Sequence, residues 1–175
     1  MTTGSLTAFT GPIGVGKTTL ARKLCADRSK IGDTCLILSF ATPIREMLAQ
    51  LVGDEYVYEN DLKTEPIEWL GGKTPRQLLQ SLGTSWGRET IHPDIWVNAT
   101  KELILNIRKA RPESHIYIDD LRFNNEAQMV HALKGRIVFL NRDGVKSTDE
   151  HASERGISNA YIDEVISLND ERELS

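Results

Sequence analysis

A short segment near the N-terminus constrains this chain more than any other. The residues GPIGVGKT, Gly11 to Thr18, fit the pattern G-x-x-x-x-G-K-[ST] at every fixed position. In such a loop the glycines let backbone N–H groups approach an anion without a Cβ in the way, and the following helix adds its positive N-terminal end. The apolar segment 5–10 precedes the motif, and apolar side chains at helical spacing follow it. A strand, a glycine loop and a helix in this order predict a phosphate-binding loop.

Each part of this loop has an expected ligand. The Lys17 ammonium suits the β- and γ-phosphates of a nucleoside triphosphate, and the Thr18 hydroxyl suits Mg²⁺. The alternative is a glycine turn with a solvated lysine, which the flanking strand and helix make the weaker interpretation. The residues expected to bind the triphosphate are Gly11, Ile13, Gly14, Val15, Gly16, Lys17, Thr18 and Thr19.

Strands and helices alternate along the rest of the sequence. Further strands are predicted at 34–40, 115–120 and 136–142, with a fifth in the segment YIDEVISL. The alternation predicts an α/β fold with a mainly parallel sheet covered by helices on both faces. The segment between the second and third strands is much longer than a crossover connection needs. We therefore expect one domain with a core at 1–40 and 99–175 and a helical insertion at about 41–98 that binds substrate.

Three helix starts carry recognisable signals. Thr42-Pro43 and Thr74-Pro75 each place a threonine before a proline, which predicts an N-cap followed by proline at the first helical position. Gln77 lies three residues after Thr74 and completes a capping box. Asn124 is the expected N-cap of a later helix.

Two carboxylates follow the predicted strand 115–118. Asp119 and Asp120 lie where a P-loop protein holds Mg²⁺ from the side opposite the loop. The alternative is a strand that ends in two solvated acids. The pattern favours a metal-side role for at least one of them and does not choose between them.

Missing motifs narrow the class of protein. Neither N-K-x-D nor D-x-x-G occurs, which argues against a GTPase switch, and 175 residues can hardly house a motor or remodelling ATPase. A small kinase is the leading class.

Five arginines at the ends of predicted elements bear on what this kinase would phosphorylate. Any one of them alone is best explained as a solvated side chain. As a set in a chain of net charge −4 they favour an anionic acceptor, because the guanidinium fork binds phosphate through two parallel hydrogen bonds. A monophosphate acceptor is already largely a dianion and needs no catalytic base. The five are Arg45, Arg76, Arg88, Arg122 and Arg142.

Overall composition adds only exclusions. The net negative charge gives no support for binding nucleic acid or an anionic membrane, and no segment has the length of a membrane span or the pattern of a signal peptide. We therefore expect a cytoplasmic protein. Cys25 and Cys35 match no metal-ligand spacing and are expected as reduced, small core residues, with a disulfide or metal site as the less favoured alternative.

Three later segments, TPRQLLQSLGTSWGRETIHPDIWVN, IDDLRFNNEAQMV and HASERG, resemble the deoxynucleoside monophosphate kinases of tailed bacteriophages. These belong to the P-loop nucleoside monophosphate kinase group. The resemblance implies a three-layer α/β/α fold with a lid at about 143–158, and often a homodimer. It also implies transfer of the γ-phosphoryl of ATP to a deoxynucleoside monophosphate with Mg²⁺, in the supply of deoxynucleotides for DNA synthesis.

The resemblance also implies roles for individual residues. Arg45, Arg76 and Arg88 would bind the acceptor phosphate, and Trp96 would flank its base or sugar, although packing in the core explains Trp96 equally well. Arg142 would stand at the start of the lid segment. The residues implied in catalysis are Lys17, Asp120, Arg122 and Arg142, and the lid element H-x-S-E comprises His151, Ser153 and Glu154.

Two alternatives stay open at this level. One is a P-loop kinase with a hydroxyl acceptor, similar to dephospho-coenzyme A kinase, in which one of Asp119 and Asp120 would act as base. The other is a nucleotide-binding module without catalytic activity.

Overall fold

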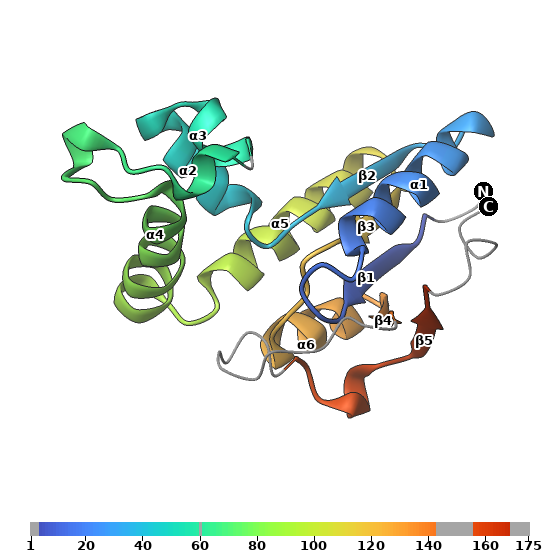
Figure 1. Cartoon of the computed structure of the whole chain (residues 1–175). Helices are drawn as coiled ribbons and strands as arrows, with labels where there is room; N and C mark the ends of the chain where they lie inside the picture. The colour runs from blue at the N-terminus through green and yellow to red at the C-terminus, as the bar shows by residue number, and fades with distance from the viewer. Residues whose placement is uncertain (1–3, 60, 143–155, 169–175) are drawn as a thin grey trace. The chain divides into compact units, whose positions relative to one another are not determined.

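Within the residues that the computed structural model describes, 4–59, 61–142 and 156–168, five strands form one sheet (Figure 1). Their order is β2-β3-β1-β4-β5, and every neighbouring pair is parallel. The strands are β1 (Leu6–Thr10), β2 (Cys35–Leu38), β3 (His115–Ile118), β4 (Arg136–Asn141) and β5 (Glu164–Ser167). All five strands predicted from the sequence are present, with ends that differ by a few residues.

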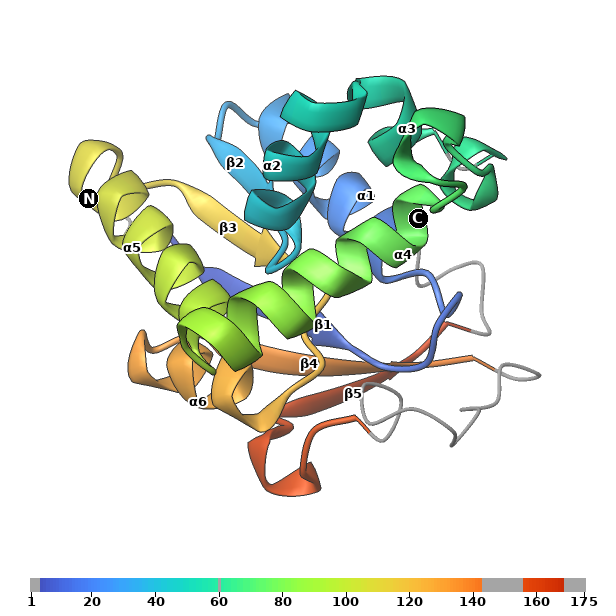
Figure 2. The ribbon, with the colours of Figure 1, turned by 90° about the vertical axis from the view of Figure 1, so that its left-hand side faces the viewer.

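The sheet is covered on both faces, which follows from the alternation of side chains along its strands. Phe9 of β1 and Val138 of β4 are register partners and pack with Leu20 and Ala21 of α1 (Lys17–Lys30). On the opposite face, a Cβ placed on Gly135 would contact both Leu6 of β1 and Val130 of α6 (Asn124–Ala132). Figure 2 shows α6 and the C-terminal part of α5 (Ile95–Ala110) on that side. The fold is therefore the predicted three-layer α/β/α arrangement.

The chain divides into two compact units, Met1–Phe40 with Thr100–Ser175, and Ala41–Ala99. The first unit contains the whole sheet. The second is helical and packs its own apolar cluster around Leu48, Val57 and Ile67. Its elements are α2 (Thr42–Val52), α3 (Asp54–Tyr58), the 3₁₀ turns η1 (Asp61–Thr64) and η2 (Glu68–Leu70), α4 (Pro75–Gln80) and the π-helix η3 (Ser81–Ile91).

The three predicted helix starts had different outcomes. Thr74 is the N-cap of α4, and its side chain and that of Gln77 each accept a hydrogen bond from the other residue's backbone N–H, as predicted. Thr42 is not a cap, because α2 begins one residue earlier than expected and Ala41 takes the N-cap position. Asn124 is not a cap either: it is the first residue of α6, and its side-chain oxygen accepts from the Ser158 N–H.

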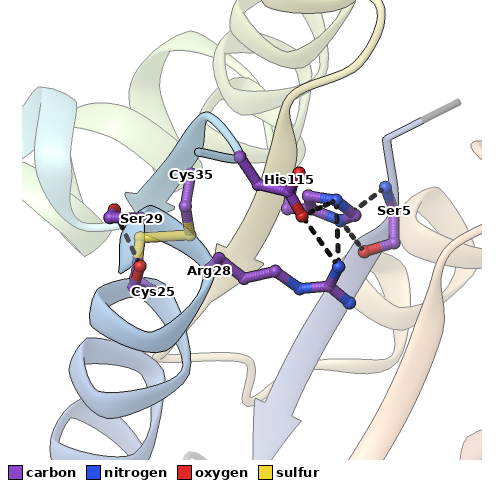
Figure 3. The surroundings of a disulfide bond; sticks show 7 residues. Ser5, Cys25, Arg28, Ser29, Cys35 and His115 are labelled. Carbon is purple, nitrogen blue, oxygen red and sulfur yellow. Dashed lines mark hydrogen bonds and ion pairs between the residues drawn. A yellow bond between two sulfur atoms is a disulfide. The ribbon is translucent and has the colours of Figure 1, made fainter. Parts of the chain in front are cut away.

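The expectation for the two cysteines was wrong. Cys25 of α1 and Cys35 of β2 form a disulfide (Figure 3). The chain reverses direction between the end of α1 and the start of β2, which brings the two Cα atoms to 5.4 Å, within the usual range for a disulfide. Sequence spacing alone does not reveal this approach.

Beside the disulfide lies a small polar cluster (Figure 3). Arg28 and His115 both contact the Asp33 carboxylate, at 3.1 Å and 3.4 Å, and the Ser5 hydroxyl lies 2.8 Å from His115 Nδ1. These contacts join α1 to the start of β3.

In the part of the chain that the structure describes, no helix is both long and apolar enough to span a membrane.

Candidate active site

The glycine loop leaves β1 at a point where the backbone allows no side chain. Gly11 has a φ of +136°, and a Cβ there would lie 2.4 Å from the Leu140 carbonyl oxygen of β4. Gly16, the N-cap of α1, has a φ of +110°. Both values favour glycine, which is why the motif needs it at these positions.

The first turn of α1 is suited to an anion. It contains no acidic residue, and no side chain caps its backbone N–H groups. Thr18 and Thr19 at this turn are exposed, as are Ile13 and Gly14 in the loop, whereas Val15 is fully buried and anchors the loop to the core. These features fit the triphosphate of a nucleotide.

Lys17 lies against the loop from which it projects. Its Nζ donates hydrogen bonds to the carbonyl oxygens of Gly11, at 2.8 Å, and Pro12, at 2.9 Å. Burial and the charge of Arg122 lower its pKa from 10.5 to about 8, although Asp119 and Asp120 act in the opposite direction. The ammonium is therefore close to Arg122 and to both carboxylates.

The charged residues predicted for this region follow the three central strands. Asp119 and Asp120 follow β3, Lys17 follows the loop after β1, and Arg142 follows β4. Because these strands are parallel and adjacent, their carboxyl ends lie along one edge of the sheet, where ligands of open α/β sheets bind. A Cβ on Gly16 would lie 3.5 Å from Nη2 of Arg142, so this guanidinium lies over the end of the loop.

The two carboxylates differ in their surroundings. Asp120 accepts hydrogen bonds from the Phe40 N–H, at 2.8 Å, and from the Ser39 hydroxyl, each on a different oxygen. It thereby fastens the residues that follow β2. The backbone N–H of Asp119 donates to the Leu38 carbonyl oxygen and extends the pairing of β3 with β2. The sequence did not reveal that Asp120 holds a neighbouring strand end.

These carboxylates are compatible with Mg²⁺. The described residues contain no cluster of three or more His, Cys, Asp or Glu side chains suited to a metal, so they offer no closed all-protein cage. Mg²⁺ commonly binds through one or two carboxylates together with substrate phosphates and water. Asp119, Asp120 and the exposed Thr18 hydroxyl are a donor set of that kind.

One buried carboxylate in this unit was missed. Glu126 is 2% exposed, and its Oε2 accepts from the backbone N–H groups of Arg122, at 2.8 Å, and Phe123, at 3.0 Å. It fixes the backbone from which the Arg122 side chain projects. A glutamate three residues after a helix N-cap is a known signal, but the sequence placed the cap at Asn124 and so missed it.

The second unit gathers cations of its own. Arg45 lies in the first turn of α2, Arg76 in the first turn of α4, and Lys63 in η1. Burial lowers the pKa of Lys63, and the charges of Arg45 and then Arg76 lower it further, so the three cations lie near one another. Lys63 was not predicted. Such a cluster suits a phosphate group.

Arg88 and Trp96 share one partner. Arg88 Nη1 and the Trp96 indole N–H both donate to the Gly83 carbonyl oxygen, at 3.1 Å and 2.8 Å. Trp96 is only 3% exposed, which favours the packing role over contact with a base. Beside it lies Trp86, which is 40% exposed, with the ring centroids 6.2 Å apart.

The predicted lid falls mostly outside the described residues. Arg142, which would stand at the start of the lid segment, is described. Residues 143–155, which include His151, Ser153 and Glu154, are not.

Comparison with known proteins identifies the family. A family model described as deoxynucleotide monophosphate kinase matches residues 72–174, more than half of the chain. A protein of Acanthamoeba polyphaga mimivirus named "Putative deoxynucleotide monophosphate kinase" is 29% identical over 174 residues, covering 94% of this chain and 88% of that protein.

Two solved structures are more distant. The shikimate kinase from Bacteroides thetaiotaomicron has a TM-score of 0.47 at 12% identity, covering 97% of this chain and 92% of its own. The protein APE1195 has a TM-score of 0.44 at 17% identity, and the match covers 89% of this chain and 67% of that protein. The match of the family model over more than half of the sequence shows that this chain belongs to the deoxynucleotide monophosphate kinase family.

Proposed function

We propose that this kinase transfers the γ-phosphoryl group of ATP to a deoxynucleoside monophosphate with the help of Mg²⁺, giving ADP and a deoxynucleoside diphosphate. The observation that carries the proposal is the set of groups at the carboxyl ends of the three central strands: an uncapped helix N-terminus, Lys17, Arg142 and two carboxylates. Membership of the family supports the monophosphate acceptor.

On the donor side, Gly11 to Thr19 would bind the phosphates of ATP through backbone N–H groups and the Thr18 hydroxyl. Lys17 and Arg142 would place positive charge where negative charge spreads over the oxygens of the migrating phosphoryl group, with Arg122 beside Lys17. Mg²⁺ held by Thr18 and one or both of Asp119 and Asp120 would supply charge neutralisation.

On the acceptor side, Arg45, Arg76 and Arg88 would bind the monophosphate, joined by Lys63. The acceptor is largely a dianion at neutral pH, so its oxygen can attack without a base to remove a proton. What these residues contribute is relief of the repulsion between two anions. We place the product in the supply of deoxynucleotides for DNA synthesis in the cytoplasm, and we infer that the enzyme acts as a homodimer, as is frequent in similar kinases.

The test is an assay of ADP release with ATP and Mg²⁺ against a panel of monophosphates, with the deoxy and ribo form of each base side by side. We expect turnover with one or more deoxynucleoside monophosphates and none when Mg²⁺ is removed by chelation. Lys17→Ala should lose most of the turnover. Turnover only with a substrate that offers a hydroxyl group would contradict the proposal, and so would ATP binding without turnover of any acceptor.

A further inference from the structure

The Gly83 carbonyl oxygen joins two side chains that the reaction would use differently. It accepts one hydrogen bond from the indole N–H of Trp96, at 2.8 Å, and one from Nη1 of Arg88, at 3.1 Å. Gly83 lies near the start of the π-helix η3, Arg88 near its end, and Trp96 in the first turn of α5. One backbone atom therefore couples α5 to the guanidinium of Arg88.

The indole has little room to move from this position. It is 3% exposed, and a Cβ on Gly87 would lie 2.5 Å from its Cζ2 atom, so the ring lies directly on the backbone of η3. Gly83 is less tightly confined: a Cβ there would lie 3.2 Å from Cδ1 of Ile44. Both glycines are buried. The close packing fixes the direction in which the indole N–H points.

The π-helix explains why Arg88 reaches the same atom. In a π-helix the backbone hydrogen bonds join residues five apart, as in the bond from the His92 N–H to the Gly87 carbonyl oxygen. Arg88 lies five residues after Gly83, and its side chain bonds back along the same face. The Thr90 hydroxyl makes the equivalent contact with the Ser85 carbonyl oxygen.

We propose that Trp96 is a positioning residue that acts through the Gly83 carbonyl to hold the Arg88 guanidinium in the orientation that binds the acceptor phosphate. This rests on the proposed function, in which Arg88 contacts the monophosphate. An arginine side chain loses much rotamer freedom when it binds, and a guanidinium whose orientation is set beforehand loses less. Trp96 does not contact the substrate.

The experiment replaces the indole N–H while keeping an aromatic ring. Trp96→Phe should raise the KM for the deoxynucleoside monophosphate by up to about five- to tenfold, with kcat and the KM for ATP nearly unchanged, because the net worth of one hydrogen bond is the upper limit of what its loss can cost in binding. Trp86→Phe is the matched control, because Trp86 lies beside the Trp96 ring, whereas the hydrogen bond to Gly83 comes from Trp96. The KM of the Trp86→Phe variant for the monophosphate should stay near that of the wild type.

A double-mutant cycle separates positioning from general packing. If Trp96 acts through Arg88, Trp96→Phe should have almost no further effect on KM in an Arg88→Ala background. An equal rise in both backgrounds would show that Trp96 supports the fold only, and an unchanged KM in the single variant would also overturn the inference. If Trp96→Phe does not fold, benzothienylalanine at position 96, which replaces the N–H by sulfur in the same shape, gives the same comparison.

The cycle also distinguishes this inference from the function on which it rests. An Arg88→Ala variant with a normal KM for the monophosphate would remove Arg88 from the proposed acceptor site, and the positioning role of Trp96 with it. A raised KM in Arg88→Ala together with a normal KM in Trp96→Phe would overturn only the positioning role.

Discussion

At the scale of single residues, Lys17 shows how much of this site depends on local geometry. The motif predicts a lysine that reaches phosphates, and the structure adds that its ammonium donates to the Gly11 and Pro12 carbonyl oxygens of its own loop. Burial lowers its pKa to about 8 because the charged form loses hydration. The residue that would bind the migrating charge is thus close to titration at physiological pH.

This pKa predicts the alkaline limb of the pH profile. Lys17 is cationic below pH 8 and increasingly neutral above it, so kcat/KM for ATP should fall above about pH 8 and approach a tenfold loss per pH unit. The limb in kcat should lie at higher pH, because the charge of bound triphosphate raises the pKa of Lys17. Initial rates between pH 6 and 10 in constant ionic strength measure both, and a kcat/KM that stays flat to pH 10 would contradict the assignment.

Asp120 gives a second prediction at this scale. Asp120→Ala removes the acceptor of the Phe40 N–H and the Ser39 hydroxyl, so the free energy of unfolding should fall by about 2–3 kcal/mol. Asp119→Ala at the neighbouring position is the control, and we expect a smaller loss. Urea unfolding of both variants measures the difference. Equal losses would mean that the contacts at Ser39 and Phe40 do not stabilise the fold.

At the scale of elements, helix starts decide which sequence signals are reliable. Thr74 and Gln77 form the predicted capping box because both partners lie within the same four residues. The Thr42-Pro43 signal failed by one residue, since nothing local prevents α2 from including Thr42. The π-helix η3 was not predicted, because no local signal in the sequence marks hydrogen bonds between residues five apart. In the structure the Trp96 ring lies against Gly87, and its indole N–H donates to the Gly83 carbonyl oxygen.

These two threonines are a matched pair for measurement. Thr74→Ala should lower the free energy of unfolding by about 1 kcal/mol, the usual value of a threonine N-cap. Thr42→Ala should change it much less, because α2 has no side-chain cap. Chemical denaturation with circular dichroism is sufficient, and a larger loss for Thr42→Ala would contradict the observed start of α2.

At the scale of the whole molecule, the chain divides its cations between two compact units. Lys17, Arg122 and Arg142 belong to the unit that contains the sheet, and Arg45, Arg76 and Arg88 belong to the helical unit. The first unit also contains the disulfide between α1 and β2. This bond closes a short stretch of chain that links α1, the helix after the glycine loop, to β2, the strand at one end of the sheet order.

The disulfide predicts sensitivity to reductant. Reduction should lower the free energy of unfolding by about 2–3 kcal/mol, the usual effect of a bond that closes a loop of this size. Cys25→Ala/Cys35→Ala should unfold at the same urea concentration with and without dithiothreitol, which separates loss of the bond from other effects of the reductant. Thiol titration of the unreduced, denatured protein should find no free cysteine, and finding two would contradict the pairing.

The sequence alone determined the class of fold, and it predicts where a donor site would lie. Both depend on local patterns: alternating apolar segments imply a parallel sheet, and the spacing of Gly11, Gly16 and Lys17 implies a loop around phosphates. The charges that converge at the carboxyl ends of β3, β1 and β4 could be anticipated for the same reason, because parallel strands end at one edge.

Only the tertiary structure decided which groups of different elements meet. The pairing of Cys25 with Cys35, the contact of Asp120 with Ser39 and Phe40, and the shared carbonyl of Gly83 each depend on where two elements pack. Burial of Trp96 favours packing over contact with a base, a preference that one apolar stripe cannot provide. A sequence pattern fixes the face on which a side chain lies, whereas its partner is set by the packing of the whole chain.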